Sequence, residues 1–237
     1  MALAGRTVLV VVPARGGSKG VPLKNIHPLL GRPLIAYTAD VALALKCCDR
    51  AVVSTDHPEI ARVAAETGLE VPFLRPPELS GDRVSDLDVL THALVTLAAR
   101  GTVYDVVVML QPTAPLRRVA HVDDTVRALV DGGWDAVWTV TPTELKYHPL
   151  KQLRVGDGGG LSYYDQRGSS IIARQQLEAV HHRNGLAYAF TRDCLLNQKT
   201  IMGQRSAAVV VDEPGVSIDT LEDFQRAEEL MSATTRR

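Results

Sequence analysis

The stretch "TVLVVVPARGGSKGVPLKN", residues 7–25, joins an apolar run to a basic, glycine-rich loop. The first six residues are rich in β-branched side chains, which is typical of a buried strand. The thirteen residues that follow contain three glycines, three cations and two prolines. Because open α/β sheets bind ligands beyond the carboxyl ends of their strands, this change predicts a strand that ends at a binding loop.

Similar apolar runs recur along the chain and alternate with segments of helical period. The predicted strands are 7–12, 50–55, 104–111, 134–140, 186–190 and 207–212. The predicted helices are 33–46, 58–68, 85–100, 121–132 and 220–231. Alternation of this kind predicts an α/β fold with a doubly wound, mostly parallel sheet.

The overall composition makes any anion-binding site a local feature. The 237 residues are 46% hydrophobic and 22% charged, with a formal net charge of -1, so nucleic acid and anionic membranes are not expected partners. No apolar run reaches the roughly 18 to 20 residues of a membrane span. The three cysteines suit a reducing cytoplasm, and the short lead "MALAGR" before the first strand predicts no signal peptide.

One region breaks the alternation. Residues 143–183 are polar and glycine-rich and show no clear period. Loops between sheet strands usually have about two to six residues, so this region is predicted to be a lid or an insertion that packs on another subunit.

The loop that follows the first strand is suited to a polyphosphate. Its glycines let backbone N–H groups approach an anion, and its cations add positive charge. Neither the Walker A pattern nor GxGxxG is present. The residues concerned are Arg15, Gly16, Gly17, Lys19, Gly20 and Lys24.

The motif "ARGGSKGVPLKN" (14–25) resembles the signature of the acylneuraminate cytidylyltransferases, which make CMP-activated sialic acids and related sugar acids. Five further motifs in the same order extend the resemblance over nearly the full length. They are "LRPPELSGDRVSD" (74–86), "LQPTAPLRR" (110–118), "HPLKQL" (148–153), "ARQQLEAVHHRNGLAYAF" (173–190) and "SIDTLEDF" (217–224).

The resemblance implies a fold, an assembly and a reaction. The fold is Rossmann-like, of the nucleotide-diphospho-sugar transferase type, with residues 1–142 and 184–237 as the nucleotidyltransferase domain and 143–183 as an inserted dimerisation arm. The substrates are CTP and a sugar acid, with Mg2+ as cofactor, and a homodimer shares its active sites. The anomeric hydroxyl attacks the α-phosphate and pyrophosphate leaves. Both reactants are anions, so cations and a metal have to offset their repulsion.

The resemblance also assigns the nucleotide site. Arg15, Ser18, Lys24 and Asn25 are expected to hold the triphosphate and ribose, with the Gly16–Gly17 backbone and Lys19 assisting. Arg15 and Lys24 are expected to stabilise charge on the leaving group. Arg75 is expected to read the cytosine edge and Ser85 to contact the base. Two alternatives stay open: Asn25 as a turn residue, and Ser85 as a helix cap, because "SDLD" has the Ser-x-x-Asp spacing of a capping box.

The sugar acid and the metal complete the expected site. Gln111, Lys151, Arg174 and Tyr188 match residues that meet the sugar acid, although Tyr188 also suits a core. Asp219 matches the magnesium-binding aspartate, and Lys151 and Arg174 are expected to serve the partner subunit's site. No His or Glu matches a general-base position.

The chain departs from the family pattern at two positions. Ala114 replaces the usual serine of the QPTSPLR motif, which removes one possible hydroxyl contact. Ser217 replaces the first acid of a DxD pair, which weakens a two-metal arrangement. Two neighbouring residues are expected to be structural: Arg117 in the turn, and Asp56 as a helix cap with Glu59 completing a capping box.

Four functions remain open on the sequence. The leading one is CMP transfer to a nine-carbon acid such as N-acetylneuraminate, legionaminic acid or pseudaminic acid, which the motifs "RNGLAYAF" and "HPLKQL" favour. The second is the same chemistry on the eight-carbon acid Kdo. The third is transfer to a sugar 1-phosphate, and the last is a non-catalytic nucleotide-binding protein.

Overall fold

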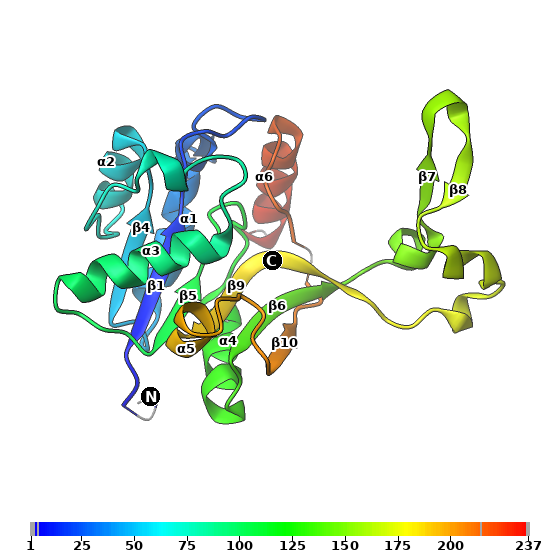
Figure 1. The fold of residues 1–237 in the computed structure, drawn as a ribbon. Helices are drawn as coiled ribbons and strands as arrows, with labels where there is room; N and C mark the ends of the chain where they lie inside the picture. Colours follow the sequence, from blue (N-terminus) through cyan, green and yellow to red (C-terminus); the bar gives the residue numbers. More distant parts are fainter. Residues whose placement is uncertain (1–2, 4, 214, 236–237) are drawn as a thin grey trace. The chain divides into compact units, whose positions relative to one another are not determined.

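In the computed structural model, which describes residues 3, 5–213 and 215–235, six strands form one sheet in the order β10-β6-β9-β5-β1-β4 (Figure 1). Every predicted strand is present. The strands are β1 (Val8–Pro13), β4 (Arg50–Ser54), β5 (Val106–Met109), β6 (Ala136–Pro142), β9 (His181–Thr191) and β10 (Ser206–Val210).

The helices also lie close to their predicted positions. They are α1 (Leu34–Ala44), α2 (Pro58–Glu66), α3 (Asp86–Ala99), α4 (Val119–Gly132), α5 (Arg192–Leu196) and α6 (Leu221–Thr235). Only the five-residue α5 was not predicted. Among the described helices, none is long and apolar enough to cross a membrane.

Strand β1 shows directly why the fold has three layers. Successive side chains of a strand point to opposite faces, and all those of β1 from Val8 to Val12 are fully buried. Val8, Val10 and Val12 pack in one cluster with α1, α2 and α4. Leu9 and Val11 pack in a second cluster with α3 and α5. Helices therefore cover both faces, and the doubly wound α/β prediction is confirmed.

The centre of the sheet is parallel, and its register positions the loops. β1 pairs with β4 and β5 in parallel, with Val11 opposite Val52 and Val10 opposite Val108. The carboxyl ends of all three strands therefore lie at one edge. β9 is antiparallel to β5, with Met109 opposite Tyr188. The chain enters β9 from residues 143–180 and not through an α-helical crossover, so nothing forces a parallel direction.

A third apolar cluster packs the last helix against the start of the chain. Val21, Leu29 and Leu34 meet Ile218 and Phe224. Leu29 belongs to a small hairpin made by β2 (Pro28–Leu29) and β3 (Arg32–Pro33). The basic loop after β1 is therefore held from its far end by the segment that leads into α6.

The chain contacts divide the protein into two compact units. The first contains residues 1–139, 184–209 and 214–237, and the second contains 140–183 and 210–213. The second unit holds the hairpin of β7 (Leu153–Val155) and β8 (Leu161–Tyr163) and several short 3-10 turns. Among its described residues, Val211 is the one buried hydrophobic side chain. This unit therefore has almost no hydrophobic core of its own.

Candidate active site

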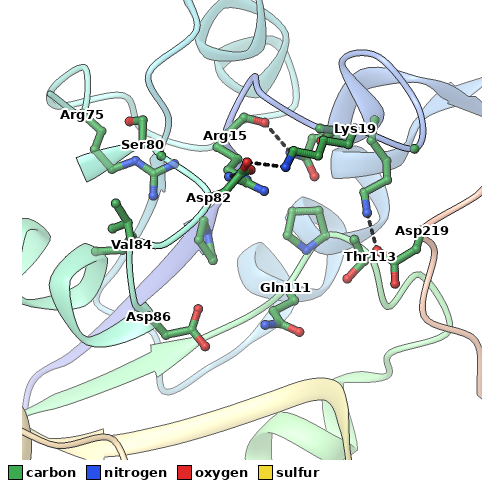
Figure 2. Close-up of a pocket in the computed structure, with 18 of the residues that line it drawn as sticks. Arg15, Lys19, Arg75, Ser80, Asp82, Val84, Asp86, Gln111, Thr113 and Asp219 are labelled. Atoms are coloured by element: carbon green, nitrogen blue, oxygen red, sulfur yellow. Dashed lines mark hydrogen bonds and ion pairs between the residues drawn. The ribbon is translucent and has the colours of Figure 1, made fainter. Parts of the chain in front are cut away.

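A cleft of about 680 Å³ opens at the carboxyl ends of β1 and β5 (Figure 2). Four segments line it: the loop after β1, residues 75–89, the turn after β5, and the residues before α6. It brings together eight of the residues that the sequence assigned to the site. They are Arg15, Ser18, Lys19, Lys24, Asn25, Arg75, Gln111 and Asp219.

Two cations of the basic loop share one carboxylate across the cleft. Arg15 Nη1 lies 2.8 Å from Asp82 Oδ1, and Lys19 Nζ lies 2.5 Å from Asp82 Oδ2. Hydrogen bonds from Lys19 and Arg15 lower the pKa of Asp82. Two ion pairs thus connect the loop after β1 to the segment before α3.

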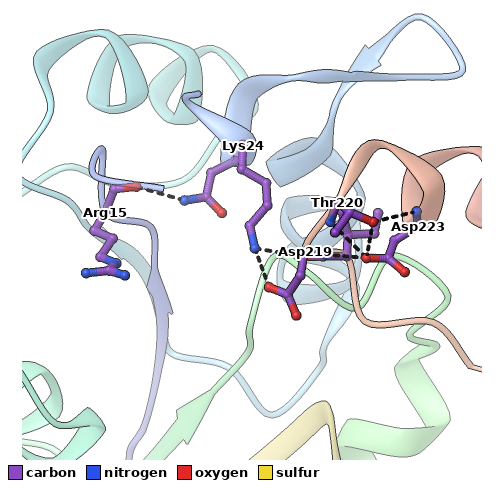
Figure 3. Close-up of polar contacts among 7 residues, drawn as sticks. Arg15, Lys24, Asp219, Thr220 and Asp223 are labelled. Carbon is purple, nitrogen blue, oxygen red and sulfur yellow. Dashed lines mark hydrogen bonds and ion pairs between the residues drawn. The ribbon is translucent and has the colours of Figure 1, made fainter. Parts of the chain in front are cut away.

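The third cation lies against the last segment of the chain (Figure 3). Lys24 Nζ is 2.7 Å from Asp219 Oδ1 and donates a second bond of 2.7 Å to the carbonyl of Ile218. The Lys24 side chain is 13% exposed, whereas that of Asp219 is 75% exposed and stays open to a ligand. Asp223 Oδ2 fixes the turn by accepting from the N–H groups of Asp219 and Thr220.

Glycines of the loop serve close packing. A Cβ at Gly20 would lie 2.2 Å from the carbonyl oxygen of Asp219, so only glycine allows this approach. A Cβ at Gly16 would lie 2.9 Å from the ring of His57. Gly17 has no atom within 4 Å of such a Cβ and does not line the cleft. Gly20 is therefore the glycine that brings loop and carboxylate together.

The predicted helix cap at Asp56 is wrong. The N-cap of α2 is His57, whose ring accepts from the N–H of Glu59, and Glu59 pairs with Arg62. Asp56 Oδ1 instead accepts from the N–H of Gly16 at 2.9 Å. Asp56 bonds to the basic loop after β1 because the N–H of Gly16 needs an acceptor there.

Asn25 ties the basic loop to itself. Its Nδ2 donates to the carbonyl of Arg15 at 3.1 Å, and the residue is buried. The turn-residue alternative is thereby supported, and Asn25 lines the cleft as well. One residue both closes the loop and faces the ligand space.

Arg75 is the most constrained charge of the cleft. The residue is 4% exposed, and among the described residues neither Nε nor Nη2 finds a hydrogen-bond partner. Nη2 lies 3.9 Å from Asp56 Oδ1. Burial lowers the pKa of Arg75, and the nearby Asp56 opposes this. Buried donors without acceptors are costly, so the guanidinium is arranged for a ligand that brings acceptors.

Gln111 projects into the cleft after the end of β5 (Figure 2). A Cβ at Gly185 would lie 2.8 Å from Gln111 Oε1, and Gly185 has a φ of +74°. Glycine at 185 therefore leaves the space that the amide occupies. Ala114 is 1% exposed and lies outside the lining of the cleft.

Arg117 has the structural role favoured by the sequence. Its buried guanidinium donates to Thr38 Oγ1 at 2.8 Å and to the carbonyl of Gly185 at 2.9 Å. It also donates to the carbonyls of Gln111 and Leu186. Burial lowers the pKa of Arg117 to about 9, so it keeps its charge at neutral pH. Arg117 therefore helps to hold the turn that presents Gln111, together with backbone hydrogen bonds such as Ala114 N–H to the carbonyl of Gln111.

Four assigned residues of the first unit lie outside the lining of the cleft: Gly16, Gly17, Ser85 and Tyr188. Ser85 is the N-cap of α3 and forms a capping box with Asp88, so the capping prediction is confirmed. Tyr188 is a core residue beside Trp138, and its hydroxyl accepts from the N–H of Gly185 at 2.7 Å. Their expected contacts with base and sugar stay predictions.

Lys151 and Arg174 belong to the second unit. Lys151 ends the 3-10 turn Pro149–Lys151, and Arg174 begins the turn Arg174–Gln176. Both side chains are exposed. His148 fixes this region from inside the unit, because its ring meets the N–H of Leu150 and the carbonyl of Glu178.

The structure adds polar cleft residues to which the sequence had assigned no contact. They are Ser80, Asp82, Asp86, Thr113 and Ser217. Asp82 lies in the quoted motif 74–86, but its partner Arg15 is 67 positions away, so no local pattern pointed to the pair.

The cleft fits a magnesium ion held mainly by substrate. Among the described residues, no group of three His, Cys, Asp or Glu side chains forms a metal centre. Asp219 supplies one exposed carboxylate. Mg2+ often binds one or two carboxylates and takes phosphate oxygens and waters as its other ligands, so this donor set suits it.

Comparison with known proteins gives three results. A family model described as cytidylyltransferase matches residues 9–235. The pseudaminic acid cytidylyltransferase of Campylobacter jejuni is 30% identical over 220 residues, covering 92% of this chain and 94% of that protein. The CMP-N,N'-diacetyllegionaminic acid synthase of Legionella pneumophila is 30% identical over 226 residues, covering 94% and 96%.

A solved structure supports the fold independently. A CMP:2-keto-3-deoxy-manno-octonic acid synthetase complexed with CTP matches with a TM-score of 0.71, covering 96% of this chain and 99% of that one. The sequence identity is 18%, so the likeness concerns the fold.

Proposed function

The chain belongs to the cytidylyltransferase family, and we propose on that basis that its cleft binds CTP and transfers CMP to the anomeric hydroxyl of a nine-carbon 2-keto-3-deoxy sugar acid. One observation carries the proposal above all: three cations and a buried arginine with unpaired donors converge on a single cleft. Such a site needs a ligand with both negative charge and planar acceptors.

The base end of the nucleotide is assigned to Arg75. Cytosine offers O2 and N3 as adjacent acceptors, which a guanidinium can meet with its free N–H groups. Because Nε and Nη2 of Arg75 are buried, their desolvation is offset only when such a base is bound. Arg75 is thereby a selector for the base.

The phosphate end is assigned to Arg15, Lys19 and Lys24. In the transfer, a bond forms between the anomeric oxygen and the α-phosphorus, and the bond from that phosphorus to the departing pyrophosphate breaks. The anomeric hydroxyl gives its proton to a phosphate oxygen of the substrate. Negative charge builds on the leaving group, and cations placed before the reaction stabilise it. A magnesium ion held by Asp219 and phosphate oxygens would neutralise further phosphate charge when bound.

Gln111 is assigned to the sugar acid. Its amide offers both a donor and an acceptor at the edge of β5, and Gly185 leaves the room it needs. The backbone of Gln111 is held by Arg117, which donates a hydrogen bond to the Gln111 carbonyl. The nine-carbon class is favoured because two relatives at 30% identity are named for pseudaminic and legionaminic acids. Kdo ranks second.

The second unit is assigned to dimerisation. Its hairpin exposes apolar side chains, among them Val155 at 70% and Leu161 at 67%. A segment with almost no core of its own is stabilised when a second copy covers it, and a two-fold axis is the usual arrangement. In this homodimer Lys151 and Arg174 would meet the sugar carboxylate in the partner's cleft. The three cysteines are free thiols, which fits a cytoplasmic enzyme.

Pyrophosphate release tests the function. The enzyme is incubated with CTP and Mg2+ and a panel of pseudaminic acid, legionaminic acid, N-acetylneuraminate, Kdo and sugar 1-phosphates. We expect release with nine-carbon acids. Release with Kdo alone or with sugar 1-phosphates alone would assign the other substrate class, and no release with any acceptor would contradict a transferase.

A further inference from the structure

We propose that Asp82 is an internal anion that competes with the triphosphate for Arg15 and Lys19. The inference rests on the proposed function, because it concerns how the same cleft takes up its nucleotide. It assigns a role in nucleotide entry to a residue that touches neither base nor sugar in the assignments above.

The contacts of Asp82 resemble those of a bound phosphate. Each carboxylate oxygen takes one cation, Arg15 at 2.8 Å and Lys19 at 2.5 Å. The three side chains come from opposite walls of the cleft (Figure 2). Asp82 thus bridges the two walls where the phosphates are expected to lie.

Nucleotide and carboxylate compete for the same two cations. Asp82 takes one contact from Arg15 and one from Lys19, so donors remain and the conflict is mainly one of charge. A carboxylate and a triphosphate placed side by side repel each other. We therefore expect the triphosphate to displace Asp82.

The segment that carries Asp82 is built for a small displacement. Upstream, Ser80 is anchored by its N–H to the carbonyl of Pro77 and by its hydroxyl to that of Pro76. Downstream, Ser85 is fixed by the capping box of α3. Between these points, the described backbone contact is a turn from Val84 N–H to the carbonyl of Gly81. The withdrawal is therefore confined to residues 81–84.

A different role for Asp82 predicts the opposite sign. If Asp82 only held Arg15 and Lys19 in their binding positions, its loss would let both side chains move and would weaken anion binding. If it competes, its loss strengthens binding. The ion pairs of Asp82 with Arg15 and Lys19 are partly exposed, and exposed ion pairs contribute little free energy. We therefore expect the loss of Asp82 to change the dissociation constant of the triphosphate by about five-fold.

Calorimetric titration separates the two roles. Wild type, Asp82→Asn and Asp82→Ser are titrated with inorganic tripolyphosphate, CTP and cytidine. Both variants should bind tripolyphosphate and CTP about five-fold more tightly, and cytidine with unchanged affinity because it brings no phosphate. The matched control is Asp131→Asn, which removes the same charge from the exposed end of α4, outside the cleft, and should leave all affinities as in wild type.

Each outcome has a defined meaning. Unchanged or weaker tripolyphosphate binding in both variants would overturn the role of Asp82, whatever the enzyme does with CTP. Tighter tripolyphosphate binding in a protein that does not bind CTP would support Asp82 and refute the proposed function. Equal tightening in Asp131→Asn would show a general charge effect and would also overturn the proposal.

Discussion

Lys24 and Asp219 meet at the point where the beginning and the end of the chain come together. Lys24 has only a small exposed fraction and two oxygen acceptors in place, so its ammonium is held before any substrate arrives. Asp219 is mostly open and keeps coordination capacity. The proposed roles differ accordingly: Lys24 acts as a fixed cation, and Asp219 as an accessible ligand for the metal.

Replacing Lys24 by alanine should lower the turnover number more than it weakens CTP binding. A fixed cation that faces the leaving pyrophosphate acts mainly when charge builds there, and losing one such donor costs about 100-fold. Steady-state kinetics with varied CTP measure both parameters. Lys46→Ala, at an exposed lysine outside the cleft, is the matched control. A raised Michaelis constant with an unchanged turnover number would contradict the assignment.

Replacing Asp219 by asparagine should abolish most of the metal-dependent rate. The amide keeps the shape but loses the charge that attracts Mg2+, and metal charge stabilisation is worth several kcal/mol, or about 100-fold and more. Rates are measured over a magnesium titration, with Glu222→Gln as an exposed neighbouring control. If Asp219→Asn keeps the wild-type rate and metal dependence, Asp219 is not a metal ligand.

At the scale of elements, the start of α3 contributes both to the stability of the fold and to the shape of the cleft. Ser85 begins the helix with a capping box, and the neighbouring Val84 and Asp86 line the cleft. The same short segment therefore has to hold a helix end and shape a wall of the cleft. This explains why Ser85 could be interpreted both as a helix cap and as a contact to the base.

A pair of substitutions separates the two roles of Ser85. Ser85→Ala should lower the free energy of unfolding by about 1 kcal/mol, because the capping box is lost. Ser85→Asn keeps a capping oxygen without adding a second negative charge beside Asp88, and it should retain stability. Denaturant unfolding measures the first effect. The Michaelis constant for CTP in the stable Ser85→Asn variant then reports any base contact made by the hydroxyl, and an unchanged value would leave Ser85 as a cap alone.

Local pattern predicted the elements well but not their long-range pairing. Runs such as residues 7–12 and 104–111 were recognised because burial on both faces requires apolar side chains throughout. The antiparallel direction of β9 could not be predicted from the sequence, because a buried strand has the same composition whether it runs parallel or antiparallel to its neighbour. The five-residue α5 is too short to show a period.

The same lack of long-range information explains which residues of the site the sequence predicted and which it missed. Arg15, Lys24 and Gln111 follow strand ends and were recognisable from position and motif. Asp82 was missed, and Asp56 was wrongly assigned, because both side chains act on a loop far away in sequence. Aspartate is a good helix cap and a good loop acceptor, and only the folded chain decides between these uses.

At the scale of the whole molecule, the first unit has a hydrophobic core and the second unit has almost none. Mixing tests whether the second unit acts in trans. Lys24→Ala subunits combined with Arg174→Ala subunits should regain activity at about a quarter of all sites, since half of the random dimers are mixed and one site in each is intact. Activity after proven subunit exchange is the measurement. No recovery, or a monomer in sedimentation, would exclude shared sites.

The contact between Gly20 and Asp219 has a consequence for the order in which the protein is made. The phosphate loop emerges early in synthesis, while the carboxylate that faces it and the apolar residues Ile218 and Phe224 emerge near the last helix. A nascent or truncated chain that stops before Ile218 carries the basic loop without the aspartate. Such a chain would lack both the carboxylate proposed to hold the metal and the apolar residues Ile218 and Phe224, which pack against Val21 and Leu29 at the far end of the basic loop.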